Sequence, residues 1–313
     1  MSEGLVALEP ADYATHVLPA TYPLWGAGRT FARYAEDLLV DARRPSGPRL
    51  FGFLLGDEIV ASCKRYERTV SACGERLRTC GIGAVFTVPH ARGRGVAGAM
   101  LAALLVRERA SVTDLGLLFS DIGSALYEPL GFHALPSRYR EFAASELGAP
   151  ASDTRSVLAA DRPEIERCDA EARTDSSWQL ERAPDEWAAL HAQRETAALA
   201  LGGPDGRLAA YVAGRAAADG SDTFFVEEFA ARTGAEGPAR ALLRVAAGTH
   251  ARVRGWNAPA AFARLVPAAA SIPRKRAILM VAPLSERGHA SWSRDRSALC
   301  AAPCDLAVPC DHF

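Results

Sequence analysis

Apolar positions recur along the first part of the chain with two periods, one typical of strands and one typical of helices. Phe31, Tyr34 and Leu38 recur every three or four residues, which gives a helix with one apolar face. Gly56-Asp57 separates two apolar runs and predicts a tight turn between two strands. Up to residue 70, the pattern predicts strands at 4–8, 49–55 and 58–70 and helices at 11–22 and 29–41.

A strand buried on both faces and a long helix come next. Ala84–Val88 is a continuous apolar run, and Pro89 ends it because proline has no backbone N–H to donate. Leu101 and Leu104 lie on the apolar stripe of a helix predicted for residues 96–110. Further strands are expected at 115–119, 132–135 and 138–143, with a short helix at 123–130.

The order of predicted elements partly repeats beyond a small, polar stretch at Gly148–Asp153, which favours a domain boundary there. We therefore expect three parts, at 1–148, 149–284 and 285–313, the last an irregular tail containing cysteines. Strands followed by strand–helix–strand predict an α/β (α+β) class with a mixed sheet flanked by helices. The second part is expected to hold helices at 160–171, 183–198 and 237–253 and strands at 207–214, 222–231 and 276–283.

Composition narrows the classes of function. The 313 residues are 49% hydrophobic and 23% charged, which is typical of a globular protein. A net charge of −1 gives no electrostatic basis for binding nucleic acid or an anionic membrane. The start lacks the pattern of a signal peptide, and no apolar run predicts a membrane span. Seven cysteines do not suggest a disulfide scaffold, so we expect a cytoplasmic protein and leave a homo-oligomer open.

The loop between the buried strand and the long helix is the segment most informative about chemistry. Gly93 and Gly95 let the backbone bend so that N–H groups converge, and the helix N-terminus adds unpaired donors and a positive dipole end. Such a loop is suited to a diphosphate. A Walker loop is excluded because Gly-Lys-Ser/Thr is missing, and a dinucleotide fingerprint fits poorly after an antiparallel start.

Arg92-Gly93-Arg94-Gly95-Val96-Ala97 fits every fixed position of an Arg/Gln-x-x-Gly-x-Gly/Ala signature, and here the chain resembles the GNAT acetyltransferases. The resemblance implies that backbone amides of this loop hold the pyrophosphate of acetyl-CoA. It also implies that the strand edge around Phe86 and Val88 pairs with the pantetheine arm and polarises the acetyl carbonyl. The alternative is a tight strand–helix turn that binds no ligand.

A second element of the resemblance is Tyr127, which with Gly131-Phe132 matches the family's Tyr-x-x-x-Gly-Phe. The resemblance implies that this tyrosine reaches the sulfur of coenzyme A and protonates the departing thiolate. The chemistry is well matched, since a phenol has a pKa of about 10 and a thiol one of about 8.5. The alternative is that Tyr127 only packs between helix and sheet.

The group that removes the proton of the amine is less clearly marked. Asp121 follows a strand and is our candidate both for binding the amine substrate and for removing its proton. Ser120-Asp121 also fits the N-cap of the predicted helix that holds Tyr127, and one carboxylate can serve both purposes. Glu128 and Glu141 are further candidates.

Ser120–Gly123, together with Tyr127 and Pro136-Ser137, is more specific than the general signature. These residues are similar to the fungal lysine N6-acetyltransferases of lysine catabolism and their bacterial relatives, which implies lysine as the acceptor. The chain departs from that pattern at Leu126, where those proteins have Phe, and at Phe132, where they have Trp.

The second part is expected to be a degenerate GNAT-like copy. Its loop Arg232–Gly237 lacks the signature spacing, and Glu236 would repel a pyrophosphate. We therefore expect this part to wall off the acceptor pocket, with Trp256 as a substrate-binding residue and with Trp187 and Asn257 as further candidates.

The sequence thus predicts an acetyl-CoA-dependent N-acetyltransferase acting on the primary amine of a small molecule. An enzyme that inactivates an amine-bearing antibiotic and a non-catalytic acyl-CoA sensor stay open as alternatives. No metal is expected, because the spacing of the cysteines and histidine near the end matches no usual zinc site. Those residues are Cys300, Cys304, Cys310 and His312.

Overall fold

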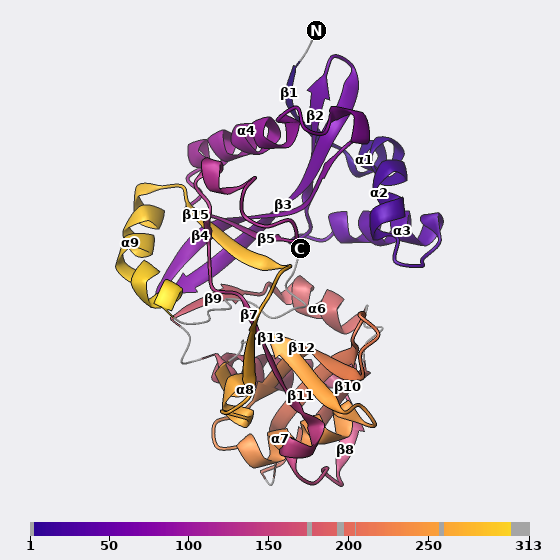
Figure 1. Ribbon diagram of the computed structural model, residues 1–313, viewed down its shortest axis with the longest axis vertical. Coiled ribbons are helices and arrows are strands. Elements are labelled where there is room, and N and C mark those ends of the chain that lie inside the picture. Colours follow the sequence, from indigo (N-terminus) through magenta and orange to yellow (C-terminus); the bar gives the residue numbers. More distant parts are fainter. Residues whose placement is uncertain (1–2, 174–176, 193–196, 204, 257–259, 302–313) are drawn as a thin grey trace.

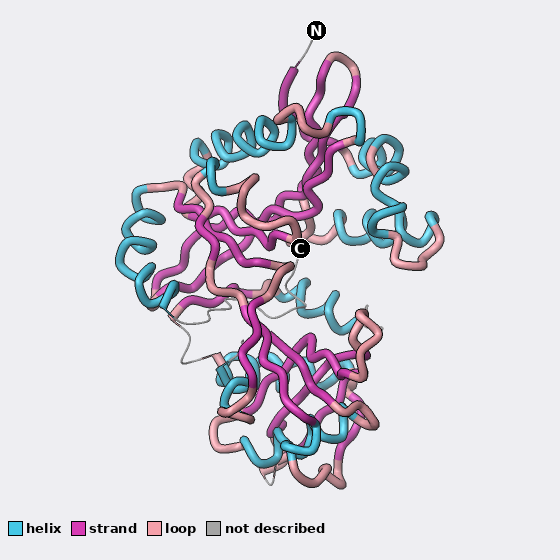
Figure 2. Tube along the Cα trace, in the orientation of Figure 1, coloured by secondary structure: helices cyan, strands magenta, loops and turns pink. Residues whose placement is uncertain are grey.

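The protein consists of two sheets flanked by helices, one above the other in the view of Figure 1, with strands and helices distinguished in Figure 2. The computed structural model describes residues 3–173, 177–192, 197–203, 205–256 and 260–301. Within these ranges, no helix has the length and apolar character needed to cross a membrane.

The first sheet is antiparallel at one end and becomes mixed where β4 pairs with β5 in parallel. A further strand, β9 (Trp178–Glu181), pairs with the end of β3. The strand order is β1 (Glu3–Leu8), β2 (Arg49–Leu55), β3 (Glu58–Ala72), β4 (Glu75–Thr87), β5 (Leu115–Ser120), β15 (Ile278–Pro283) and β6 (His133–Ala134).

Helices cover both faces of this sheet. On one face, α4 (Val96–Ala110) buries its apolar stripe, and its Glu108 accepts hydrogen bonds from Arg65 on β3. On the other face, Tyr13 packs in a cluster with Leu50 of β2. The helices around Tyr13 on that face are α1 (Pro10–His16), α2 (Leu18–Trp25) and α3 (Phe31–Ala42).

The second sheet has its own core and four α-helices among the described residues. The strand order is β14 (Ala270–Pro273), β7 (Arg138–Ala143), β13 (Arg252–Trp256), β12 (Thr223–Ala231), β11 (Leu208–Ala216), β10 (Ala197–Gly202) and β8 (Thr154–Ser156). The helices are α5 (Arg162–Ala172), α6 (Pro184–Ala192), α7 (Glu236–Ala247) and α8 (Ala260–Leu265).

The two sheets share one topology and exchange a strand. In each, three antiparallel strands lead through a helix to a parallel strand: β2-β3-β4, α4 and β5 in the first, and β10-β11-β12, α7 and β13 in the second. The next antiparallel neighbour comes from the other half of the chain, β15 beside β5 and β7 beside β13. The two halves are therefore similar folds whose sheets do not separate at residue 148.

The sequence predictions for the tail and for the helix at 123–130 are wrong. The irregular tail from residue 285 is a helix, α9 (Glu286–Ala301), as far as Ala301. Its buried positions include Gly288 and Ser291, which carry no apolar signal beside Trp292 and Leu299. The predicted helix at 123–130 is a turn followed by a short 3-10 helix at Glu128–Leu130, because Gly123 and Gly131 take left-handed backbone angles.

Candidate functional site

The strands β4 and β5 begin as a parallel pair and then separate. Their pairing runs from Thr79–Leu115 to Ile82–Leu118. Beyond it, β4 continues against β3 and β5 continues against β15. We call the edges of Gly83–Thr87 and Phe119–Ser120, which no longer pair with each other, the β4–β5 divergence. Such edges present backbone N–H and C=O groups to an extended ligand.

A β-bulge lies at the start of this divergence. Phe86 pairs with Ser62 and Gly83 pairs with Lys64, so Ala84 and Val85 together face a single β3 residue. Ala84 has a φ of 49°, a left-handed angle that costs a residue with a side chain about 1–3 kcal/mol. Bulges of this kind take backbone groups out of the regular ladder and recur next to active sites.

The loop after β4 has the geometry of an anion cradle. Gly93 and Gly95 have φ angles of 74° and 75°, and a Cβ built on either would meet no atom within 4 Å. The helix α4 then begins at Val96 without a side-chain cap and with no acidic residue in its first turn. Its N–H donors therefore stay available to an anion, and the positive end of the helix dipole faces the same point. These residues fit a pyrophosphate.

Arg92 is held against the end of β4. Its Nε donates to the carbonyl of Thr87 at 3.0 Å, and its Cζ lies 6.0 Å from the centre of the Phe86 ring. Both Arg92 and Arg94 are exposed beside the cradle, where they add positive charge. The predicted loop residues Arg92–Ala97 thus lie together at the end of β4.

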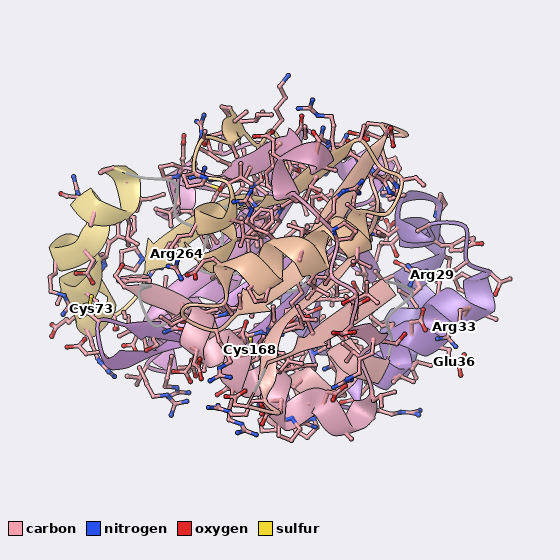
Figure 3. The ribbon with its side chains drawn as sticks, turned by 90° about the horizontal axis from the view of Figure 1, so that it is seen from below. Arg29, Arg33, Glu36, Cys73, Cys168 and Arg264 are labelled. Atoms are coloured by element: carbon pink, nitrogen blue, oxygen red, sulfur yellow. The ribbon has the colours of Figure 1, made fainter. Side chains whose placement is uncertain are left out.

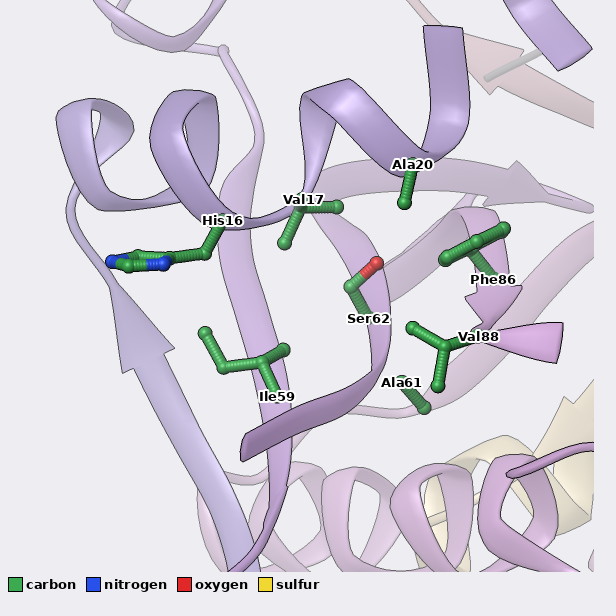
Figure 4. Close-up of a pocket in the computed structure, with 8 residues that line it drawn as sticks. All are labelled: His16, Val17, Ala20, Ile59, Ala61, Ser62, Phe86 and Val88. Carbon is green, nitrogen blue, oxygen red and sulfur yellow. The ribbon is translucent and has the colours of Figure 1, made fainter. Parts of the chain in front are cut away.

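A small pocket open to solvent lies between the α1–α2 turn and strands β3 and β4, as Figure 4 shows. The side chains of Phe86 and Val88 line it, and the backbone N–H of Val88 donates to the carbonyl of Val60 on β3 at 3.0 Å, so this N–H does not face a ligand at the strand edge. The Trp25 ring stands edge-on to Phe86, with 6.2 Å between ring centres. The other lining residues are His16, Val17, Ala20, Ile59, Ala61 and Ser62.

Tyr127 lies beside β5, on the face that α4 covers. It is only 5% exposed and belongs to the cluster that includes Leu118 and Met100, with its ring edge-on to Phe132 at 6.1 Å. Burial and the nearby charge of Asp121 raise the pKa of Tyr127, and a hydrogen bond with Ser120 opposes that rise. The phenol is therefore protonated at neutral pH, as a proton donor must be.

Asp121 is an exposed residue in the turn that follows β5. Its Oδ1 accepts a hydrogen bond of 2.8 Å from the backbone N–H of Ala277, in the segment between β14 and β15. The predicted N-cap does not form, because no α-helix follows. The hydroxyl of Ser120 instead closes the turn by donating to the carbonyl of Gly123 at 2.5 Å.

The other two carboxylates considered from the sequence are placed differently. Glu141 lies on β7 in the second sheet and accepts hydrogen bonds from Arg252 and Arg254 at 2.8 and 2.5 Å. Burial alone would raise the pKa of Glu141, but these two guanidinium groups hold it below its usual value. Glu128 is exposed on the 3-10 helix beside Tyr127.

Trp256 brings the second half of the chain to the first sheet. It ends β13, is 4% exposed, and lies 5.5 Å from Phe119 on β5, ring centre to ring centre. The guanidinium carbon of Arg274 lies 3.7 Å from the centre of the indole ring. Trp187 instead carries Arg182 over its ring at 4.4 Å, and Asn257 lies outside the described residues.

The second sheet has a matching point of separation, and a carboxylate stands there. The β12–β13 pairing ends at Val226–Gly255, and a bulge precedes Glu228 as one precedes Phe86 in β4. Glu228 is 1% exposed and accepts hydrogen bonds from Arg182 and from the Tyr211 hydroxyl at 2.5 and 2.8 Å. The following helix also begins with an acidic residue, Glu236. This arrangement is unsuited to a pyrophosphate.

Two features of the site were missed by sequence reasoning. The bulge at Ala84 had a weak signal in the alternating Gly81 and Gly83 before it, since glycine within a strand often marks a bulge. The hydrogen bond between Ala277 and Asp121 had no signal in the sequence, because the two residues are far apart in the chain. Among the described residues, no cluster of His, Cys, Asp or Glu could hold a metal ion, and Cys300 is exposed on α9.

Comparison with known proteins agrees with this geometry. Residues 30–135 match the family described as acetyltransferase (GNAT) domain. The GCN5-related N-acetyltransferase of Kribbella flavida is 23% identical, with a TM-score of 0.69 over 90% of this chain and 72% of that chain. A probable N-acyltransferase of Enterococcus faecalis is 16% identical, with a TM-score of 0.71 over the same shares.

The fold also resembles a more distant enzyme, the N-myristoyltransferase of Saccharomyces cerevisiae with bound myristoyl-CoA. It is 9% identical, with a TM-score of 0.60 over 90% of this chain and 78% of that chain. A search of curated protein sequences finds no match. Residues 30–135 thus match the GNAT acetyltransferase family, and the solved structures share the fold of the whole chain.

Proposed function

We propose that this chain transfers an acetyl group from acetyl-CoA to the primary amine of a small molecule, with the side-chain amine of free lysine as the leading acceptor. The observation that carries the proposal is the arrangement at the β4–β5 divergence. A diphosphate cradle ends β4 at Gly93–Val96, and the protonated Tyr127 lies buried beside β5. The cradle is suited to the pyrophosphate of coenzyme A, and the phenol is suited to giving a proton to its sulfur.

Each residue then has a defined task. Acetyl-CoA supplies an activated thioester when bound. The nitrogen of the neutral amine attacks the thioester carbonyl carbon, the carbon–sulfur bond breaks, and Tyr127 gives its proton to the departing sulfur. Asp121 is the proposed receiver of the proton that the amine loses, through Oδ2, because Oδ1 is held by Ala277.

The choice of lysine rests on the sequence similarity at Ser120–Gly123, and that of acetyl on the signature at Arg92–Ala97. We assign the chemistry to 1–148 and the acceptor wall to 149–284, with β7 and β15 exchanged between them. Glu228 and Glu236 support a second half without its own coenzyme. We place the reaction in the cytoplasm.

The test is release of free thiol from acetyl-CoA in the presence of a panel of primary amines that includes lysine and aminoglycosides. Turnover with lysine supports the proposal, and turnover with an aminoglycoside alone would move the function to antibiotic inactivation. Tight binding of acetyl-CoA without thiol release from any amine would show an acyl-CoA sensor. Absence of coenzyme A binding would refute all three.

A further inference from the structure

Lys64 occupies a particular place next to the β4–β5 divergence. On β3 it pairs with Leu50 of β2 on one side and with Gly83 of β4 on the other. Its neighbour Arg65 bonds Glu108 of α4, and successive strand residues point to opposite faces. Lys64 therefore faces the α1–α3 side, and the charges that act on it are those of Asp41 and Arg29.

Lys64 is half-buried, and its side-chain ammonium group makes no hydrogen bond or ion pair with the described part of the chain. The nearby carboxylates are engaged elsewhere. Asp41 pairs with Arg44, and Asp37 pairs with Arg29 and Arg33 at 3.0 and 2.8 Å. Figure 3 labels Arg33, which lies on α3, and Arg29, which precedes that helix. Burial lowers the pKa of Lys64, which is the sign of an ammonium group that has lost water without gaining a partner.

The neighbouring glycine leaves Lys64 beside the divergence. Gly83 is the first residue of β4 beyond the last pair with β5, and it places no side chain between Lys64 and that edge. Adjacent strands are about 4.8 Å apart, so Lys64 stands one strand spacing from the edge. Of the 36 basic residues in the sequence, only Lys64 and Lys275 are lysines. Nearly all basic side chains of the protein are therefore guanidinium groups, and Lys64 is one of two that carry a compact ammonium group, which binds as a point charge.

From this arrangement we infer that the amine acceptor carries a carboxylate, and that Lys64 pairs with it while the amine lies at the divergence. The inference rests on the proposed acetyl transfer and names the substrate class of that same site. Lys64 is then a binding residue that selects amino acids over simple amines, and it takes no part in moving protons.

The experiment compares acceptors that differ only in the carboxylate. Thiol release is measured with lysine, ornithine and phenylalanine, each beside its carboxamide, for the wild-type chain and for Lys64→Met, Lys64→Arg and Lys275→Met. Lys275 is exposed and serves as the matched lysine control. Binding of coenzyme A is measured for every variant, so that a folding defect is recognised.

We expect the wild type to favour at least one free acid over its carboxamide by tenfold or more in kcat/KM. Lys64→Met should abolish that preference through KM, Lys64→Arg should retain part of it, and Lys275→Met should keep it whole. Equal use of acid and carboxamide by the wild type would overturn the inference and leave the acetyltransferase intact. If Lys64→Met instead lowered kcat for the free acids and for the carboxamides alike, Lys64 would have a role in proton transfer, and the inference would be overturned. Turnover of no amine by the wild type would refute the proposed function itself.

Discussion

The ring of Trp256 at the end of β13 lies 5.5 Å from the ring of Phe119 on β5, so that the second half of the chain packs directly beside the β4–β5 divergence. Phe119 is one of the two residues of β5 beyond its last pair with β4. This contact brings the second half to the divergence, while Glu228 fills the point of strand separation in the second sheet.

Replacing Trp256 tests this role. Trp256→Leu removes the ring that faces Phe119 and should raise the KM for the acceptor about tenfold, about 1.4 kcal/mol of binding free energy. Trp256→Phe keeps an aromatic ring and should have a smaller effect. The affinity for coenzyme A, measured by calorimetry, should stay the same in both. Unchanged acceptor KM in Trp256→Leu would remove the residue from the site.

Tyr127→Phe should lower kcat by at least tenfold, because the departing sulfur loses its proton donor. The variant keeps the ring that packs on Phe132, so its thermal stability and coenzyme affinity should change little. Burial raises the pKa of Tyr127, so the wild-type rate should not fall from loss of the phenol proton until the pH exceeds the ordinary value of about 10. If kcat of Tyr127→Phe equalled that of the wild type, the hydroxyl of Tyr127 would have no catalytic role and the ring would serve only in packing.

The positive φ of Gly95 is required by the cradle. Gly95→Ala meets no steric obstacle but strains the backbone by about 1–3 kcal/mol, and coenzyme A should bind at least fivefold more weakly. Gly56→Ala is the matched control, since Gly56 has a φ of 65° in the β2–β3 turn and an equally open Cβ position. The Gly56→Ala variant should lose about as much stability as Gly95→Ala and should bind coenzyme A as tightly as the wild type. Equal affinities in the two variants would argue against the cradle.

The buried pair of Arg65 and Glu108 joins β3 to α4. Its side chains are 8% and 5% exposed, and Arg65 donates to both oxygens of Glu108 at 3.1 and 2.9 Å. Glu108→Leu leaves the buried guanidinium with only the exposed Glu67 as its ionic partner, at 3.3 Å, and should cost about 3 kcal/mol in urea unfolding. The double variant Arg65→Met with Glu108→Leu should recover most of this loss. A double variant as unstable as the single one would mean that the pair itself provides the stability.

Asp295 fastens α9 to the first sheet by accepting a hydrogen bond of 2.8 Å from the indole nitrogen of Trp178 on β9. A hydrogen bond from Arg294 and the one from Trp178 lower the pKa of Asp295, against the effect of burial. The pKa of an aspartate in the unfolded chain is about 3.9, and that of Asp295 in the folded chain is lower. The ionised carboxylate therefore stabilises the fold at pH values above about 3.9, and this contribution is lost as the pH falls through the folded pKa.

The protection of the α9 amides against hydrogen exchange, corrected for the intrinsic exchange rate at each pH, should therefore fall below about pH 4 in the wild type. Asp295→Asn removes the titrating group and should exchange faster at neutral pH, with a smaller further change on acidification. An identical pH dependence in the variant would assign the acid sensitivity to another group.

The local parts of the site could be predicted from the sequence. Gly93 and Gly95 follow an apolar strand and precede a helix, so the cradle could be predicted from residues that are close together in the chain. The helix at Val96–Ala110 was predicted with the observed bounds for the same reason. The prediction of a helix holding Tyr127 was wrong, because the two glycines at the ends of this short stretch take left-handed backbone angles.

What the sequence by itself determined was the set of elements whose signal lies within a few residues: the cradle, the strands around it and the type of fold. Only the tertiary structure decided which strands became neighbours. It placed β15 against β5 and β7 against β13, and it brought Trp256 to Phe119. The physical reason is that strand pairing and ring contacts form between segments more than a hundred residues apart, so that no local period records them. For the same reason, the sequence alone did not single out Lys64, whose place beside the β4–β5 divergence depends on its cross-strand partner Gly83.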